Sequence, residues 1–334
     1  MRGHKYQLTA QQRLHIIIMI GIFKEKEFSM NHSWHNAFSS VLSDRQILES
    51  EPMSRHTTFG IGGPADCFLL PRSKKELCDI CRISSEEGYP LFIIGGGANL
   101  LVRDKGIRGV VLSTELMNQL VCDGQSIITD SGNPTGKVAR FALACGLAGM
   151  EFASGIPGSV GGAAYMNAGA YGGEMSKIVA SATTCDPKGQ IRIYNQDEIG
   201  YAYRHSLFMQ THEIIISLAL HLYPDSQEEI RKRMEDLQNR RRSKQPLEYR
   251  SAGSTFKRPP GHFVGAMIEE LGLKGFSVGD AQVSEKHAGF LINRGHATCR
   301  DMISLMQEVQ QRVRDKYGVS IEPEVQIVGE EEEQ

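Results

Sequence analysis

The chain has 334 residues, and 37 Lys and Arg stand against 39 Asp and Glu, for a formal charge of −2. This length predicts two or three domains, and the balanced charge excludes a general nucleic-acid-binding protein and an acidic disordered chain. The 7 cysteines are scattered and odd in number, which does not indicate a disulfide framework. We therefore expect reduced thiols and a cytoplasmic protein.

The N-terminal region contains one long apolar run, residues 14–23. A membrane-spanning helix needs roughly 20 apolar residues, so this run predicts no membrane insertion. Charged residues 24–27 follow it directly and no small-residue cleavage site is present, which disfavours a signal peptide. We expect residues 1–35 to be an N-terminal extension that is disordered or not native, ahead of a possible internal start at Met30.

Residues 71–109 have the pattern of a βαβ-like unit. Apolar residues at helical spacing predict a helix over residues 74–87, and an apolar run predicts a buried strand over residues 91–94. The three glycines at 95–97 then form a turn. The next expected elements are short strands at 100–102 and 110–112 and a helix at 136–146.

The second half of the chain mixes short strands with long helices. Residues 180–222 contain runs of β-branched and apolar residues, which predict strands. A strongly charged helix is expected over residues 228–242, and Pro246 ends it. The other expected elements are strands at 182–185, 191–194, 214–222, 290–293 and 326–328 and helices at 262–271 and 298–317.

Glycine accounts for 35 of the 334 residues, and its excess is confined to four short segments. In one segment Gly95, Gly96 and Gly97 follow a strand, and successive residues without a Cβ can turn their N–H groups toward one phosphate. This run is not the G-x-G-x-x-G fingerprint of a Rossmann fold. In another segment, residues 155–164, the lack of side chains leaves space for a flat ring or a second phosphate. Together the segments indicate a bound dinucleotide, and a tight crossing between domains is the alternative for residues 155–164.

Several polar residues are candidates for chemistry. Arg204 next to Tyr203 presents a fork of donors that suits a carboxylate or phosphate, with an ordinary surface arginine as the alternative. Ser254 has no G-x-S-x-G elbow around it, which disfavours a hydrolase. Glu322 and Glu324 precede the last strand, and the spacing does not tell which of them faces a cleft. The histidines show no pairing at metal-ligand spacing, so we predict no metal site.

Seven motifs together resemble one family, the flavin-dependent UDP-N-acetylenolpyruvoylglucosamine reductases (MurB) of bacterial cell-wall synthesis. They occur in family order over about residues 50–329, and the QVSEKHAGF segment resembles the branch that lacks an extra substrate-capping insertion. The motifs are HTTF with IGGPAD, GGGANLLV, GIPGSVGGAAYMNAGAYG, YRHSLF, SAGSTFKRP, QVSEKHAGFLIN and EPEVQIVG.

The resemblance implies an α+β fold. A two-lobed FAD-binding domain of the vanillyl-alcohol-oxidase (PCMH) type is expected first, followed by a smaller α+β substrate-binding domain. The implied limits are 45–225 for the FAD-binding domain, with lobes at about 45–113 and 114–225, then 226–329 for the C-terminal domain and 330–334 for an acidic tail.

The resemblance also implies noncovalent FAD, NADPH as cosubstrate and UDP-N-acetylglucosamine enolpyruvate as substrate, in peptidoglycan precursor synthesis and hence cell shape and division. Hydride would pass from reduced flavin to the enolpyruvyl β-carbon, with Arg204, Ser254 and Glu324 at the catalytic positions and Ser254 giving the proton. Tyr203 and Lys244 fall at substrate contacts. The positions implied to line FAD are Gly95, Gly96, Gly97, Asn99, Leu100, Gly155, Ile156, Gly158, Ser159 and Gly162.

Two departures from the family pattern are visible. Ala98 stands where the family often has Ser, which removes one possible hydroxyl contact to a pyrophosphate, and Ser251 replaces a frequent Asn. The alternatives to the reductase are another FAD-dependent oxidoreductase of the same fold with a different substrate, and a nonenzymatic module that binds a nucleotide sugar or flavin. No nucleic-acid partner is expected.

Overall fold

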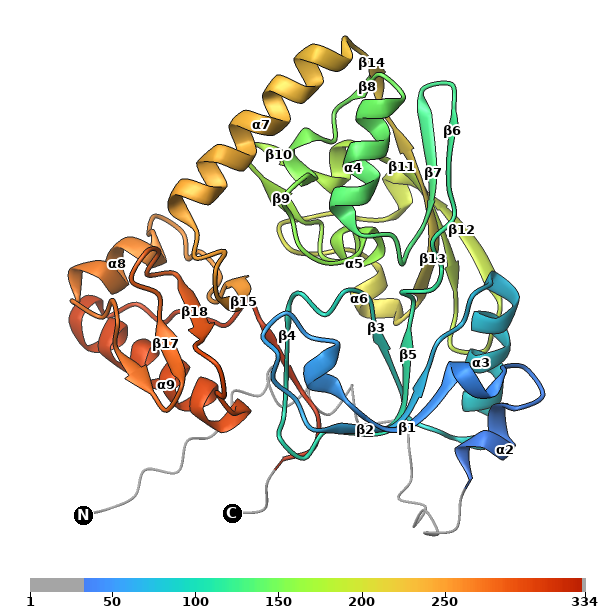
Figure 1. Cartoon of the computed structure of the whole chain (residues 1–334), viewed down its shortest axis with the longest axis horizontal. Helices are drawn as coiled ribbons and strands as arrows, with labels where there is room; N and C mark the ends of the chain where they lie inside the picture. Colours follow the sequence, from blue (N-terminus) through green and yellow to red (C-terminus); the bar gives the residue numbers. More distant parts are fainter. Residues whose placement is uncertain (1–32, 332–334) are drawn as a thin grey trace.

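The computed structural model describes residues 33–331. Three sheets, each with helices packed on it, form three units that follow one another from blue to red in Figure 1. We call the unit built on β1, β2, β5 and β3 the first lobe, the unit built on β12, β11, β13, β7 and β6 the second lobe, and the unit built on β15, β18, β17 and β16 the C-terminal unit.

The first lobe combines antiparallel and parallel pairing in a four-stranded sheet. Strand β1 (Ile47–Pro52) runs antiparallel to β2 (Pro64–Leu69). Strands β2 and β3 (Leu91–Ile94) both pair parallel with β5 (Ile107–Ser113). Helix α3 (Lys74–Glu87) connects β2 to β3 and buries one face against the sheet. The helix and strand predicted for residues 74–87 and 91–94 are confirmed.

Helix α2 (Trp34–Phe38) extends the first lobe toward the N-terminus. The ring centroids of Trp34 and Tyr89 lie 5.1 Å apart in an edge arrangement, so α2 packs near the end of α3. Residues 34 and 35, which we assigned to an N-terminal extension, therefore belong to this lobe. Residues 1–32, with the apolar run at 14–23, lie outside the described residues. Within residues 33–331 no helix is long and apolar enough to cross a membrane.

The second lobe is an antiparallel five-stranded sheet with helices α4 (Thr135–Ala144) and α5 (Val160–Tyr165) against one face. The helix predicted at 136–146 corresponds to α4. The five strands of this sheet are β6 (Leu120–Asp123), β7 (Ser126–Asp130), β11 (Val179–Cys185), β12 (Ile191–Asn195) and β13 (Ile214–His221).

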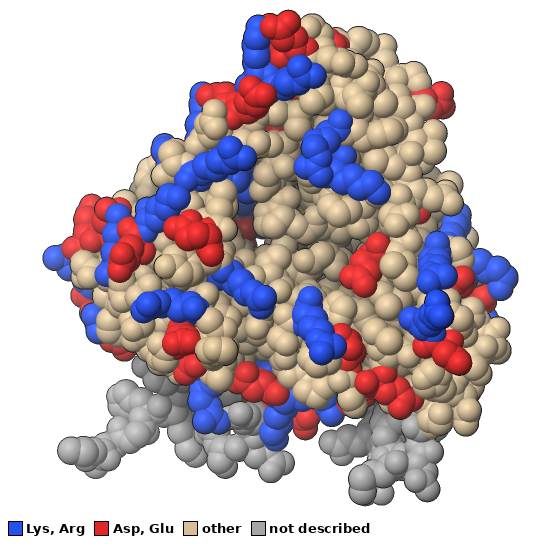
Figure 2. Space-filling model, in the orientation of Figure 1, with Lys and Arg blue, Asp and Glu red and all other residues tan. Residues whose placement is uncertain are grey.

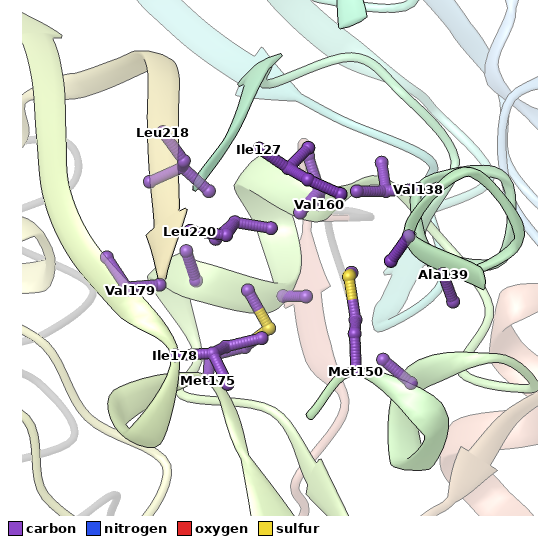
Figure 3. Packing of buried hydrophobic residues seen from close by; sticks show 14 of the residues in the cluster. Ile127, Val138, Ala139, Met150, Val160, Met175, Ile178, Val179, Leu218 and Leu220 are labelled. Carbon is purple, nitrogen blue, oxygen red and sulfur yellow. The ribbon is translucent and has the colours of Figure 1, made fainter. Parts of the chain in front are cut away.

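The core of the second lobe lies between this sheet and its helices. Figure 3 shows Ile127, Leu218 and Leu220 of the sheet directed toward Val138 of α4 and Val160 of α5. All five side chains are buried. Burial of these apolar surfaces fixes both helices against the sheet, which places the residues just before α5 at the inner end of the lobe.

Helix α7 (Gln227–Lys244) leaves the second lobe and reaches the C-terminal unit (Figure 1). Its two buried residues, Ile230 and Met234, belong to the core of the second lobe. The sequence analysis places a domain limit at residue 226 and so assigns α7 to the C-terminal domain. The buried side of α7 packs instead on the second lobe, which belongs to the expected FAD-binding domain. Pro246 follows the helix, as expected.

The C-terminal unit is an antiparallel sheet with two helices, and the sheet order is β15-β18-β17-β16. The helices predicted at 262–271 and 298–317 are confirmed, the second with Thr298 as its N-cap. The elements are β15 (Arg250–Ser254), α8 (Val264–Glu270), β16 (Ser277–Val278), β17 (Ala281–Val283), β18 (Phe290–Asn293) and α9 (Cys299–Tyr317).

The contacts between the C-terminal unit and the first lobe include a helix cap and a strand pairing. The carboxylate of Asp104 accepts hydrogen bonds from the backbone N–H groups of Cys299, at 2.9 Å, and Arg300, at 3.1 Å, at the N-terminus of α9. The last strand, β19 (Gln326–Val328), pairs parallel with β4 (Leu100–Val102) of the first lobe. The chain thus returns to the first lobe after the C-terminal unit, inside the 226–329 segment that we assigned to one domain.

The other elements are short. They are β8 (Leu147–Ala148), β9 (Gly169–Ala170), β10 (Gly173–Glu174), α6 (Phe208–Thr211), β14 (Tyr223–Pro224) and the 3-10 helices at Asp44–Gln46, Met53–Arg55, Glu151–Ala153, Met175–Lys177 and Gln196–Glu198.

All seven cysteines are free, as predicted. Cys78 and Cys81 of the single CxxC lie on α3, where Cys81 is fully buried. Burial raises the pKa of Cys67 and of Cys299 to about 12, so these thiols are protonated at neutral pH.

A pair of glycines tests how tightly the loop after β3 of the first lobe is packed, with Gly124 in the β6–β7 turn of the second lobe as the comparison. Gly97 has a φ of +58°, and a Cβ built on it would overlap the carbonyl oxygen of His56; Gly124 has the same φ of +58° with nothing within 4 Å. Gly124→Ala should lower the free energy of unfolding by about 1 kcal/mol through left-handed strain alone. Gly97→Ala should lower it by roughly 3 kcal/mol, because the overlap adds to the strain. Urea unfolding followed by circular dichroism measures both, and equal losses would contradict the close contact at Gly97.

Candidate active site

A large cavity lies where the two lobes and the C-terminal unit meet. Its volume is about 1950 Å³, whereas pockets for one small ligand typically enclose roughly 300–1,000 Å³. Figure 2 shows a hollow near the middle of this face, with Lys and Arg side chains on several sides of it. The cavity has room for a large cofactor together with a second ligand.

The site residues implied by the family resemblance converge on this cavity, with two exceptions. Tyr203 is 62% exposed and does not line the cavity, and Lys244 is exposed at the end of α7. The lining residues among the predicted ones are Gly95, Gly96, Gly97, Asn99, Leu100, Gly155, Ile156, Gly158, Ser159, Gly162, Arg204, Ser254 and Glu324.

The two glycine-rich segments touch each other as well as the cavity. A Cβ built on Gly96 would lie 2.5 Å from the Cα of Gly158, and one built on Gly95 would overlap the hydroxyl of Ser159. These positions therefore need glycine so that the lobes can approach, which is the tight crossing weighed above as an alternative. Because the same residues line the cavity, both interpretations apply to them.

Residues 155–164 also contain a helix start that the glycines concealed in the sequence. The hydroxyl of Ser159 accepts a hydrogen bond from the backbone N–H of Gly162 at 3.3 Å and caps α5. A Cβ built on Gly161 would lie 2.5 Å from the Cβ of Ser131, so this helix sits directly on the loop after β7. Glycine lowers helix propensity, which is why periodicity alone did not reveal α5.

Arg204 occupies a strained turn of the second lobe. Its φ is +53°, in the left-handed region that residues with a side chain seldom adopt. The turn is closed by two backbone hydrogen bonds between Ala202 and His205, of 3.1 and 3.2 Å. Strain of this kind persists only where the surroundings hold it, and it is concentrated at functional sites.

Two buried polar residues hold this turn, and neither was identified from the sequence. The hydroxyl of Ser206 donates to the carbonyl of Tyr165 at 2.7 Å, and the side chain of Asn167 donates to the carbonyl of Ala202 at 3.0 Å. Both Ser206 and Asn167 are buried. They lie within the YRHS and YMNAG motifs, so these motifs contain residues that support the position of Arg204.

Glu324 faces the cavity and forms an ion pair with Arg204, with Nε and Oε1 2.6 Å apart. Its backbone N–H donates to the carbonyl of Thr255 at 2.8 Å, and its own carbonyl accepts from the side chain of Asn99 at 3.0 Å. Glu322 pairs instead with Lys257 at 3.3 Å, and its side chain is 68% exposed against 16% for Glu324. The question that spacing left open is thereby answered in favour of Glu324.

Ser254 ends strand β15 at the cavity wall. The pairing of β15 with β18 is irregular between Ser251 and Ser254, and Gly253 has a φ of +78°. A left-handed glycine of this kind forms a bulge that redirects the following side chain. Glycine before Ser254 is therefore required by the backbone, and the hydroxyl is exposed to the cavity.

Two buried hydroxyls that line the cavity have no hydrogen-bond partner in the described chain, namely those of Thr58 and Ser131. Leaving such a group unpaired costs about 1–3 kcal/mol. A ligand with acceptor oxygens at these positions would satisfy both. The local sequence does not identify either hydroxyl as unpaired, because the lack of a partner depends on how distant segments pack around it.

Arg241 of α7 also lines the cavity. Its guanidinium donates to the carbonyl of Gly155 and lies 6.0 Å from the ring centroid of Tyr171. Burial lowers its pKa, and no carboxylate of residues 33–331 forms an ion pair with it. A half-buried cation without an acidic partner favours an anionic ligand. The sequence placed it only within the strongly charged helix expected over residues 228–242.

Comparison with known families assigns the two parts of the chain. Residues 65–194 match the model of an FAD-binding domain. Residues 245–328 match the model of the C-terminal domain of UDP-N-acetylenolpyruvoylglucosamine reductase. Together with the two lobes around the cavity, these matches define an FAD-binding oxidoreductase of α+β fold.

The chain belongs to the family of UDP-N-acetylenolpyruvoylglucosamine reductases. It is 46% identical to the reductase of Caldanaerobacter subterraneus over 87% of this chain and 96% of that protein. It is also 46% identical to the reductase of Clostridium novyi, over 88% of this chain and 96% of that protein. The solved structure of the Thermus caldophilus reductase (MurB) matches with a TM-score of 0.72 and 32% identity, over 84% of this chain and 97% of that chain.

These comparisons confirm the family resemblance, the fold class and the assignment as an FAD-containing oxidoreductase. The residues at the cavity fit FAD. The glycine loop at 95–97 brings backbone N–H groups to the cavity, and the hydroxyls of Thr58 and Ser131 and the guanidinium of Arg241 are further hydrogen-bond donors. A pyrophosphate and a flavin ring with carbonyl oxygens need such donors. Within residues 33–331 no group of three or more His, Cys, Asp or Glu is placed to hold a metal ion.

A variant of Asn99 tests whether its side chain positions Glu324 or binds FAD. Asn99→Ala should lower turnover about tenfold, because the loss of one buried hydrogen bond loosens the carbonyl of Glu324. Bound flavin, measured by absorbance of the purified protein, should remain at the wild-type level, since the Asn99 side chain is directed to Glu324. Loss of flavin together with activity would show that the side chain serves the cofactor instead.

Proposed function

We propose that this protein catalyses the NADPH-dependent, FAD-mediated reduction of UDP-N-acetylglucosamine enolpyruvate to UDP-N-acetylmuramate, in cytoplasmic peptidoglycan precursor synthesis. The observation that carries the proposal is that Arg204, Ser254 and Glu324, one from each of three separate segments, line the same cavity as the glycine-rich walls. The identity of 46% to reductases of this name supports the same substrate.

FAD, bound without a covalent link, would accept hydride from NADPH and supply it to the β-carbon of the enolpyruvyl double bond. The residues that we assign to its binding are those from the two glycine-rich segments, together with Thr58 and Ser131, whose hydroxyls lack partners. Their position on both lobes would clamp an elongated cofactor between them. The glycines bring backbone N–H groups to the cavity surface, which suits phosphate oxygens.

Arg204 is assigned to the substrate carboxylate and to the negative charge that develops beside it. In the present arrangement Nε pairs with Glu324, so the two terminal amino groups of the fork are left for a ligand. A charge held in place before the reaction stabilises a transition state without reorganisation, and such stabilisation is usually the largest single contribution to catalysis. The strained turn and its buried supports give Arg204 that fixed position.

Ser254 is assigned as the proton donor to the carbon next to the carboxylate. A hydroxyl is a weak acid, so this role requires a strongly basic acceptor within hydrogen-bond distance. The enolate formed after hydride addition is such an acceptor. The bulge at Gly253 presents the hydroxyl to the cavity, and solvent would restore its proton.

Glu324 is assigned to orient and polarise the substrate beside Arg204. Its backbone joins the strand that carries Ser254 through the carbonyl of Thr255. Tyr203 and Lys244 remain proposed substrate contacts at the rim, since each neighbours a lining residue in the sequence. The guanidinium of Arg204 lies 5.2 Å from the ring centroid of Tyr203, an arrangement that also steadies the arginine.

Ser254→Ala tests the proton donor. The variant should still be reduced by NADPH at the wild-type rate, because Ser254 has no part in hydride transfer to the flavin. Formation of UDP-N-acetylmuramate should fall by about three orders of magnitude or more, as general acid catalysis contributes roughly 10²–10⁴-fold. Stopped-flow flavin absorbance follows the first half-reaction and product chromatography the second. An equal loss in both would remove Ser254 from this role.

Arg204→Lys tests the fork of donors. A lysine keeps the charge but cannot make two parallel hydrogen bonds to a carboxylate, and it has no donor at the position of the Nε that pairs with Glu324. We expect kcat/KM for the nucleotide sugar to fall by about 10²-fold, with FAD retained. Wild-type turnover in this variant would identify Arg204 as an ordinary surface arginine.

A further inference from the structure

The arginines at the cavity differ in their partners. Arg103 pairs with Glu331, Arg108 with Asp66 and Glu330, and Arg204 with Glu324. Arg241 donates only to a backbone carbonyl. Arg250 is distinct again, because among residues 33–331 it has neither an ion pair nor a hydrogen-bond acceptor.

Arg250 is the first residue of β15, and its side chain reaches the first lobe. A Cβ built on Gly60 would overlap Nη1 of Arg250 and would lie 2.8 Å from its Cδ. The absence of a side chain at Gly60 thus makes room for the guanidinium. The acidic residue nearest in sequence, Glu248, pairs with Lys286 at 3.8 Å and does not neutralise it. An unpaired cation is therefore held at the junction between the C-terminal unit and the first lobe.

Thr58 connects this position with the glycine loop. Its hydroxyl is buried without a partner and lines the cavity. Its backbone N–H donates to the carbonyl of Gly97 at 3.1 Å, which fixes it beside the loop. Thr58 is two residues from Gly60, where the guanidinium of Arg250 lies. The guanidinium that lies against Gly60 and the hydroxyl of Thr58 both belong to residues that line the cavity.

We propose that Arg250 and Thr58 form a diphosphate-binding site on the cavity wall next to Gly97. Guanidinium and hydroxyl donors bind phosphate oxygens through charge-assisted hydrogen bonds. The proposal rests on the proposed function, because FAD, NADPH and the nucleotide sugar each carry a diphosphate. Proximity to the glycine loop favours the diphosphate of FAD, and the other two are sources that the experiment separates.

The first measurement is the dissociation constant of FAD, obtained from flavin fluorescence when purified holoprotein is diluted. Arg250→Met should weaken FAD binding by at least about tenfold and Thr58→Val by about threefold to tenfold, as expected for charged and neutral hydrogen bonds. The matched control is Arg240→Met. Arg240 is 59% exposed, pairs with Asp236 at 2.8 Å and does not line the cavity, so its loss should leave FAD binding unchanged.

The source of the diphosphate follows from steady-state kinetics of the same variants. A rise of about tenfold in KM for the nucleotide sugar, with FAD retained, assigns the site to the nucleotide sugar. The same rise in KM for NADPH alone assigns it to NADPH. If FAD affinity and both KM values stay at the wild-type level in Arg250→Met and Thr58→Val, the proposal is wrong.

Further measurements distinguish a role of Arg250 in ligand binding from a structural role in packing against Gly60. Arg250→Lys should recover part of the lost affinity, and the defect of Arg250→Met should shrink as salt rises, because a charge interaction is screened. Thr58→Val should not lower the melting temperature without FAD, since it removes an unpaired hydroxyl. Equal destabilisation with and without FAD in both variants would overturn the proposal. The FAD measurements stay informative even if the wild-type protein does not reduce the nucleotide sugar.

Discussion

The arrangement of the cavity depends on the backbone N–H and C=O of Glu324. Its N–H donates to the carbonyl of Thr255, directly after Ser254, and its carbonyl accepts from Asn99, two residues after Gly97. Strand β19 begins two residues later and pairs with β4 of the first lobe. The side chain of Glu324 is thus positioned by the C-terminal unit and the first lobe together, so the wall that carries Ser254 and the glycine loop cannot shift independently.

The second lobe is joined to this point through Arg204. The ion pair with Glu324 spans 2.6 Å between side chains that are mostly shielded from solvent, which makes it stronger than an exposed pair. A left-handed arginine costs on the order of 1–3 kcal/mol, and the buried hydrogen bonds of Ser206 and Asn167 offset that cost. The three groups assigned to catalysis therefore come from the second lobe, the C-terminal unit and the segment before β19, and the geometry among them depends on how these parts pack together.

Local sequence signals were sufficient for most elements, and the family resemblance supplied most of the predicted residues that line the cavity. The helix at 74–87 was predictable because its caps and its apolar face are contained in the segment itself. The return of β19 to the first lobe was not, because a three-residue strand carries no mark of its partner. Thr58 and Arg250 were missed for the same reason, because segments distant in the sequence decide whether a hydroxyl or a cation has a partner.

The glycine excess that first pointed to a ligand does not by itself identify one, because Gly96 and Gly158 are also needed where the lobes touch. The chemistry of the unpaired groups at the cavity is more selective. The hydroxyls of Thr58 and Ser131 lack partners, and the guanidiniums of Arg241 and Arg250 lack carboxylates in the described part of the chain. A cavity whose open groups are donors and cations selects ligands rich in acceptor oxygens. Diphosphates and a flavin ring have that character, whereas an apolar ligand of the same size would leave the two hydroxyls without an acceptor and the two guanidiniums without an anion.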